Sequence, residues 1–465
     1  MRTLRSVTPT AEQLAILSRT RPGVELIRGA AGSGKTTTAL LRLKSLIGFF
    51  LNRLRREEEN RPVNVLVLTY NRTLRGYIDA LTEEQATNYT GVNLQIETFG
   101  RWAMNLLNNP RLVDETLRRS TLIAFGARLR YSPEFLFDEA EYVLGRFLPN
   151  ELDRYLTIRR DGRGASPRME RQNRQSLLDE VIRPYQQWKQ DRGVLDWNDL
   201  ATALIEHELT PLYDIVVTDE AQDFSANQVR AINNQLADDH SLTFVLDSAQ
   251  RIYARGFTWQ EAGLTIRPEQ IRQLKINYRN TIEIAKVAAS LIEGVPLDDD
   301  GTIPDFQACS RHGPIPLLLR GRFGRQMEFV IRYLKSQVDL SNESVAFLHP
   351  LGWFGEIRRA LDKANLPFID ITRRSEWPQG SENIALSTMH SAKGLEFDHV
   401  IILGLNAEVT SHGDEDDDDR LITLRRLLAM GIGRARMSVV IGYKPEEVSK
   451  LISYIDPSTC KAVDL

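Results

Sequence analysis

The chain has 465 residues, of which 42% are hydrophobic and 26% are charged, an ordinary balance for a globular protein. This length predicts two to four domains, and no apolar run is long enough to cross a membrane. The N-terminus lacks the apolar core of a secretory signal. Only two cysteines occur, Cys309 and Cys460, which argues against a disulfide framework and for a reducing, cytoplasmic setting.

The charge of the chain gives only weak information about its partners. The net charge of −3 does not indicate a nucleic-acid binder. The segment Arg154–Arg174 carries seven arginines against two acidic residues, but a basic segment is usually a solvated face and supports nucleic-acid binding only weakly. The histidines and cysteines show no spacing typical of a metal site.

Short runs of Val, Ile and Leu alternate with amphipathic stretches, which predicts an α/β fold with parallel sheets. The predicted strands are Val24–Arg28, Val63–Thr69, Leu94–Thr98, Tyr213–Thr218, Leu242–Leu246, Pro316–Leu319, Ser344–Leu348, Ile384–Ser387, His399–Leu403 and Ser438–Gly442. They form two sets that separate near residue 270. We expect residues 1–102 and 206–270 to form a first domain, 103–205 a mostly helical insertion in it, and 271–465 a second domain.

A glycine-rich loop follows the first predicted strand and precedes a helical stretch. It reads Gly29, Ala30, Ala31, Gly32, Ser33, Gly34, Lys35 and Thr36, which matches the P-loop pattern. Its glycines let backbone N–H groups surround phosphate oxygens, and the helix N-terminus favours the same anion. We expect Lys35 to hold the β and γ phosphates and the Thr36 hydroxyl to face Mg²⁺. The loop therefore predicts an ATP site.

Two adjacent carboxylates end the predicted strand Tyr213–Thr218. One carboxylate can hold Mg²⁺ while the next orients and deprotonates the attacking water. We assign Asp219 to the metal and Glu220 to the catalytic base. Together with the P-loop, this pair predicts hydrolysis of a nucleoside triphosphate.

Several segments resemble the ordered motifs of the UvrD/Rep-type superfamily 1 helicases. In chain order they are Thr8–Gln13, Leu68–Arg72, Thr98–Phe99, Asp219–Asp223, Asp247–Tyr253, Asn277–Arg279, Thr388–Phe397 and Gly433–Arg436. The set runs from about residue 8 to residue 443. The resemblance implies two RecA-like domains with ATP in the cleft between them.

The resemblance also implies how the nucleoside is held. Gln13 would pair with the adenine edge, and Tyr278 would stack on the adenine face. Glu396 would accept a hydrogen bond from a ribose hydroxyl. Thr37 stands where close relatives often carry an arginine that packs on adenine, so nucleotide affinity or base preference is expected to differ.

Three further residues are implied to act on the γ-phosphate. Gln250 would sense it, and Arg279 and Arg434 would reach it from the second domain as arginine fingers. The motif around Arg434 departs from the family pattern, because Gly433 stands in place of the usual threonine. Because both arginines belong to the second domain, hydrolysis would require a closed cleft. The Gly433 departure affects only the local geometry expected around Arg434.

The resemblance places contacts to a nucleic-acid strand in both domains. The candidates are Thr69, Asn71, Thr98, Phe99, Tyr253 and Trp259 in the first domain and Thr388 and His390 in the second. Aromatic side chains of this kind can stack on bases without regard to sequence. The expected activity is ATP-dependent movement on single-stranded DNA, tracked 3′ to 5′ as in the family.

One family feature is missing from the sequence. Larger relatives insert a second accessory domain before the motif Thr388–Phe397, and the short stretch between Phe368 and Ile384 cannot hold one. This favours a second hypothesis, a motor subunit that depends on a nuclease or other partner in DNA repair or anti-phage defence. An RNA-directed motor and a P-loop NTPase without any nucleic-acid role are the remaining alternatives.

Overall fold

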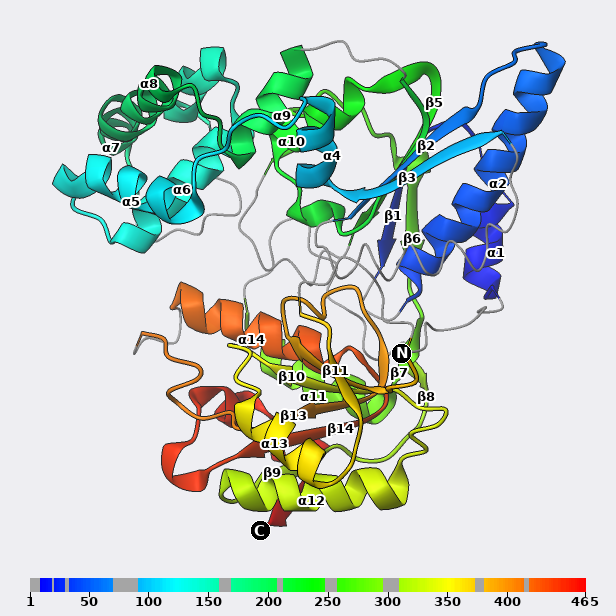
Figure 1. The fold of residues 1–465 in the computed structure, drawn as a ribbon, viewed down its shortest axis with the longest axis vertical. Coiled ribbons are helices and arrows are strands. Elements are labelled where there is room, and N and C mark those ends of the chain that lie inside the picture. The colour runs from blue at the N-terminus through cyan, green and yellow to red at the C-terminus, as the bar shows by residue number, and fades with distance from the viewer. Residues whose placement is uncertain are drawn as a thin grey trace.

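The computed structural model describes residues 9–18, 21–29, 33–69, 91–158, 169–206, 212–246, 257–295, 309–372, 380–413 and 418–465. Its two large parallel sheets lie one above the other in Figure 1, with the segments of the first third of the chain in the upper part. Helices flank both sheets, so the predicted α/β class with two domains and a helical insertion is confirmed.

The first sheet has six parallel strands in the order β3-β2-β4-β5-β1-β6. They span Gly23–Gly29 (β1), Val63–Thr69 (β2), Val92–Thr98 (β3), Tyr213–Thr218 (β4), Leu236–Leu246 (β5) and Ile271–Leu274 (β6). Helices α1 (Ala11–Leu17), α2 (Lys35–Arg56) and α10 (Ala226–Asn233) accompany them. The central strands β2 and β4 are buried along their whole length, which explains why they appear in the sequence as continuous apolar runs.

Helices occupy the chain between β3 and β4. They are α4 (Phe99–Leu106), α5 (Glu115–Phe125), α6 (Pro133–Arg146), α7 (Arg171–Leu177), α8 (Arg183–Arg192) and α9 (Trp197–Glu206), with a 3-10 segment at Pro149–Leu156 and a π turn at Leu178–Ile182. Residues between Leu122 and Tyr185 form an apolar core of their own, whereas α4 and α9 pack on the core of the first sheet. The limits 103 and 205 of the predicted insertion remain predictions.

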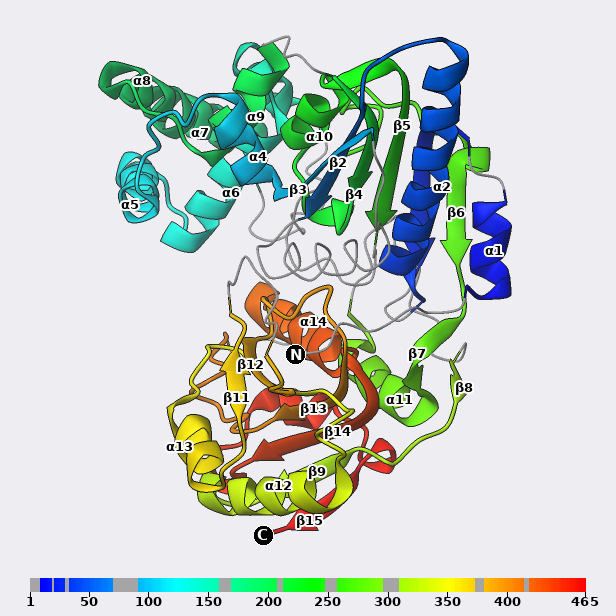
Figure 2. The same ribbon diagram turned by 45° about the vertical axis from the view of Figure 1, so that its right-hand side comes forward.

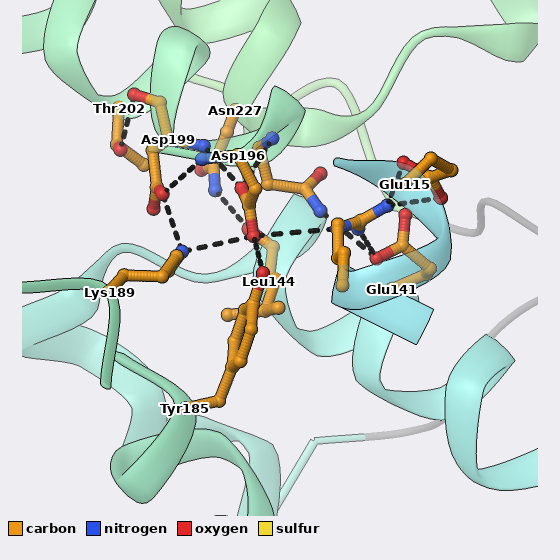
Figure 3. Close-up of polar contacts among 11 residues, drawn as sticks. Glu115, Glu141, Leu144, Tyr185, Lys189, Asp196, Asp199, Thr202 and Asn227 are labelled. Carbon is orange, nitrogen blue, oxygen red and sulfur yellow. Dashed lines mark hydrogen bonds and ion pairs between the residues drawn. The ribbon is translucent and has the colours of Figure 1, made fainter. Parts of the chain in front are cut away.

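A buried polar network joins α8 to the start of α9 (Figure 3). One oxygen of Asp196 accepts hydrogen bonds from the backbone N–H of Asn198 and Asp199, at 2.8 and 3.0 Å. Its other oxygen accepts from the Tyr185 hydroxyl and the Lys189 ammonium, both at 3.0 Å. Because a buried carboxylate is stable only when paired in this way, the network fixes where the helical core meets the first domain.

A second set of contacts ties α6 to the first domain. The amide of Asn227, on α10, donates to the carbonyl oxygens of Leu144 and Phe147 at 3.0 and 3.1 Å. The Arg146 guanidinium pairs with Glu261 at 2.8 Å. Both interactions are buried or nearly so, so the insertion is attached by specific bonds and not only by its two chain connections.

The second sheet has seven parallel strands in the order β11-β12-β10-β13-β14-β9-β15. They span Leu317–Arg320 (β9), Val345–His349 (β10), Phe368–Asp370 (β11), Ile384–Thr388 (β12), Phe397–Ile402 (β13), Ala435–Tyr443 (β14) and Lys461–Asp464 (β15). Its helices are α11 (Ile282–Ile292), α12 (Phe323–Gln337), α13 (Gly355–Lys363) and α14 (Asp419–Ile432). Short strands β7 (Asn277–Thr281) and β8 (Cys309–Arg311) pair beside this sheet, as Figure 2 shows.

Short 3-10 segments complete the described chain, at Gly126–Arg128, Ala221–Asp223, Pro268–Gln270, Pro445–Glu447, Lys450–Tyr454 and Pro457–Thr459. Within the part of the chain that the structure describes, no helix is both long and apolar enough to span a bilayer. All ten predicted strands fall on observed strands, whereas β6, β7, β8, β11 and β15 were not predicted.

Candidate nucleotide and strand sites

The P-loop leads directly into α2, whose first residue is Lys35. Gly34 caps this helix with φ of +79°, a conformation that glycine adopts without steric cost. A side chain at Gly34 would also meet the Gln13 amide at 2.5 Å. Gln13 is buried, donates to the Gly34 carbonyl at 3.2 Å and accepts from the Thr10 N–H at 2.9 Å. The predicted adenine-reading residue thus lies against the phosphate loop.

The two carboxylates predicted to serve catalysis meet the P-loop. The Thr36 hydroxyl donates to Asp219 at 3.0 Å, so the two proposed Mg²⁺ ligands are adjacent. Glu220 has φ of +53°, an uncommon value for a non-glycine residue and one that marks a constrained turn after β4. Burial, reinforced by the charge of Glu220, raises the pKa of Asp219 to about 7. A cation bound here would favour the ionised form of Asp219.

The Lys393 side chain, from the second domain, lies against two acidic residues that follow β4. Its side chain is only 2% exposed, bonds to Asp223, and lies 3.7 Å from Glu220. Burial opposes ionisation of Glu220, but the charges of Lys393, Arg434 and Lys35 outweigh it and hold the pKa of Glu220 below its usual range. The proposed base is therefore ionised, as proton acceptance requires. Lys393 was not among the predicted site residues.

Arg279 lies on β7 and bonds to Glu396. Its guanidinium Nε and Nη1 are buried and have no hydrogen-bond partner among the residues that the structure describes. Because buried guanidinium donors are normally satisfied, this arrangement leaves two donors for an acceptor such as a phosphate oxygen. In this structure Glu396, the predicted ribose acceptor, is the ion-pair partner of Arg279.

Arg434 is buried at the junction of α14 and β14, where its charge acts on Glu220. Gly433 ends α14 with an ordinary right-handed conformation, so the position makes no use of the special freedom of glycine. The Asn280 amide, 1% exposed, donates to the carbonyl oxygens of Gly433 and Ala435 at 3.1 and 2.6 Å. Asn280 therefore holds the segment of Arg434 against the segment of Arg279, and no sequence pattern pointed to it.

The predicted strand contacts differ in how far their side chains are exposed. Thr98 caps α4 and is half-buried, Thr388 is half-buried at the end of β12, and His390 is exposed. Trp259 is half-buried and packs its ring 4.7 Å from that of Phe244, between centroids. These four residues remain candidates.

Two other candidates belong to the core. Thr69 is fully buried at the end of β2. The ring of Phe99 is 4% exposed and packs edge-on against Trp102 and Phe224. As it lies here the ring of Phe99 is too buried to stack on a base. The backbone contact expected of Thr69 needs no stacking and stays a prediction.

Other predicted residues lie outside the described chain, namely Ala30, Ala31, Gly32, Asn71, Gln250 and Tyr253, together with the side chain of Tyr278. Gly29 ends β1, Ser33 is buried, and Thr37 lies half-buried in the first turn of α2. Among the described residues, no group of three or more His, Cys, Asp or Glu side chains could hold a metal ion. A hydroxyl and one carboxylate nevertheless fit Mg²⁺, which is usually bound by few protein ligands together with substrate phosphates.

Comparison with known proteins finds helicase domains over both parts of the chain. The model of the UvrD/REP helicase N-terminal domain matches residues 10–267, and that of the UvrD-like helicase C-terminal domain matches residues 371–446. The ATP-dependent DNA helicases Rep of Escherichia coli K12 and Salmonella typhimurium LT2 are each 34% identical over 67 residues. That match spans 14% of this chain and 10% of each relative.

A solved structure, the C-terminal domain of a possible DNA helicase from Lactobacillus plantarum, is 19% identical. The match covers 40% of this chain and 98% of that domain, with a TM-score of 0.30. The N-terminal family match alone spans more than half of the chain. With its two parallel α/β sheets of the RecA-like kind, the chain belongs to the UvrD/Rep helicase family.

Proposed function

We propose that this protein hydrolyses ATP to move along single-stranded DNA, in the 3′-to-5′ direction. Family membership supports a DNA helicase, and the P-loop with its paired carboxylates supports ATP as the fuel. Four strand candidates are exposed or half-buried and lie in both domains, with Thr98 and Trp259 in the first and Thr388 and His390 in the second. A motor that alternates its grip needs contacts of this kind in each domain.

The observation that carries the proposal is the convergence of basic side chains from the second domain on the carboxylates of the first. Lys393 contacts Asp223 and Glu220, and the charge of Arg434 acts on Glu220. Arg279 lies in the segment that Asn280 holds beside Arg434, and it keeps two buried donors without partners among the described residues. Charge of this sign is what a transferring phosphoryl group needs in its transition state. Closure of the cleft would therefore couple hydrolysis to domain motion.

Each side chain of the first domain has a specific task in this proposal. Lys35 and the P-loop amides bind the β and γ phosphates, and Glu220 accepts the proton of the attacking water. Thr36 and Asp219 would hold Mg²⁺, which would neutralise phosphate charge. Gln222 donates to Glu220 and so orients that carboxylate.

The proposal is tested by the rate of ATP hydrolysis with single-stranded DNA, single-stranded RNA and duplex DNA. Single-stranded DNA should stimulate hydrolysis most strongly, and Lys35→Ala should abolish the activity by removing the phosphate charge. Displacement of streptavidin from either end of an oligonucleotide measures direction. Equal rates with and without every polynucleotide would reject a nucleic-acid motor and favour a different kind of P-loop NTPase.

A second part of the proposal concerns unwinding. Strands β11 and β12 pair directly, with Phe368 opposite Ile384, so the chain passes from one to the other through residues 371–383 alone. Opening a DNA duplex costs on average about 1.4 kcal/mol per base-pair step. Without an accessory domain at this point, we propose that the isolated chain translocates well, unwinds long duplexes poorly, and gains unwinding from a partner such as a nuclease. Processive unwinding by the chain alone would overturn this part.

A further inference from the structure

An exposed tryptophan lies on the loop that follows β10, outside every motif of the sequence analysis. Trp353 exposes 53% of its surface, and Leu351 on the same loop exposes 48%. Large apolar side chains that are this exposed are common singly, so the evidence for a role of Trp353 comes from where its loop lies and how it is held.

The position of the loop identifies that partner. Strand β10 pairs with β12 so that His349 lies opposite Thr388, and the Met389 N–H donates to the His349 carbonyl at 3.3 Å. Both strands end here, so the loop after β10 and the segment Thr388–His390 share one edge of the sheet. Gly352 has φ of +75°, and a side chain at this position would meet the Thr388 methyl group at 3.1 Å. The loop thus lies directly against the proposed strand contacts of the second domain.

The loop is held in shape by a buried histidine. The His349 Nδ1 atom accepts the backbone N–H of Leu351 at 3.1 Å and that of Trp353 at 3.3 Å. The imidazole ring stacks on Trp353, with centroids 5.8 Å apart and planes at 26°. His349 is 5% exposed, and burial lowers its pKa to about 4, so it remains a neutral acceptor at ordinary pH. A preorganised ring loses little entropy on binding.

We propose that Trp353 is a stacking platform of the second domain, on which a base of the single strand packs next to Thr388 and His390. This inference rests on the proposed function, because it names a contact for the same strand. An aromatic face suits every base, so the contact would add grip without sequence preference. It would give the second domain an aromatic contact in addition to that of Trp259 in the first.

The test is equilibrium binding of labelled oligonucleotides without nucleotide, followed by fluorescence anisotropy. Two ligands of equal length are compared, oligo-dT and an abasic strand with the same phosphates. Trp353→Ala should weaken binding of oligo-dT by about 5- to 150-fold, the range for one stacked base, and change binding of the abasic strand little. Trp353→Phe should retain most of the affinity.

Two control variants separate stacking from exposed apolar area. Leu351→Ala removes an apolar side chain from the same loop, and Phe49→Ala removes an aromatic ring, 44% exposed, from α2. Both should bind oligo-dT like the wild type, and thermal melting confirms that each variant is folded. If Trp353→Ala binds oligo-dT like the wild type, or loses both ligands equally, the inference is wrong. If the wild type binds neither ligand, the proposed function itself fails.

Discussion

The nucleotide cleft and the strand-binding face are built in opposite ways. In the cleft the side chains are bonded to one another, as Thr36 is to Asp219 and Lys393 is to Asp223, and of these four only Thr36 is not buried. On the strand face the remaining candidates are exposed or half-buried, as His390 and Trp259 are. The cleft is organised before its ligand arrives, whereas the side chains of the strand face keep part of their surface accessible to a strand.

This difference predicts how the two regions respond to substitution. Buried charges depend on each other, so a change at one residue of the cleft should affect the others and produce a large, non-additive loss. Exposed contacts act singly, so losses on the strand face should be smaller and nearly additive.

Arg434→Ala should have the largest effect. We expect kcat for ATP to fall by about 10³- to 10⁵-fold, the usual contribution of an arginine finger, with single-strand affinity nearly unchanged. Arg279→Ala should lower kcat in the same direction. Arg436→Ala is the matched control, because this side chain is half-buried and pairs with Asp398 at 3.3 Å. Normal hydrolysis by Arg434→Ala would show that Gly433 has displaced the motif.

Glu220→Gln should lower kcat by about 10²- to 10⁴-fold, because an amide cannot accept the proton of the attacking water. ATP binding, measured by equilibrium titration with a fluorescent analogue, should persist. Glu446→Gln, an exposed carboxylate in the second domain, provides the control. Turnover close to that of the wild type would remove Glu220 from the role of base.

Lys393→Met should destabilise the protein by about 3–5 kcal/mol, because it leaves the buried Asp223 without its ammonium partner. The double variant Lys393→Met with Asp223→Asn should recover part of that loss. Chemical denaturation followed by tryptophan fluorescence measures both. Strict additivity of the two single changes would contradict the description of the cleft as a coupled network.

Trp259→Ala should weaken single-strand binding by about 1–3 kcal/mol, the usual loss for one stacked base. Affinity should also fall steeply as salt rises, since phosphate contacts release counterions. The ring packs on Phe244, so thermal melting must be measured on the same sample. Unchanged affinity together with a lower melting temperature would assign Trp259 to the core.

The smallest effect concerns pH. The folded pKa of His349 lies near 4, below the ordinary value of 6.5, so the unfolded chain binds more protons between these limits. The stability contributed by neutral His349 is present above about pH 6.5 and is lost as pH falls toward 4. Between pH 7 and pH 5 we expect a loss of about 1–2 kcal/mol. His349→Gln should remove this contribution to the slope, while His312→Gln, a change at an exposed histidine, should retain it.

Most of the fold could be read from the sequence because its central strands are buried on both faces. The bounds predicted for β2 and β4 agree with the observed strands. Strands β6 and β15 were missed because they are short strands at sheet edges and each has only two apolar residues. The pairing of Lys393 with Asp223 could not be predicted, since these residues are brought together only by the docking of two domains.

The bonds between α6 and the first domain have a consequence for how the motor can be divided. Arg146 pairs with Glu261, which also accepts the Thr258 N–H at 2.7 Å, next to Trp259. The Arg230 guanidinium donates to the Arg146 carbonyl at 2.7 Å. Excision of the helical segment would remove the Arg146 guanidinium from Glu261 and the Arg146 carbonyl from Arg230, beside a proposed strand contact. The insertion therefore cannot be deleted without breaking contacts of the first domain, and a minimal motor must retain α6.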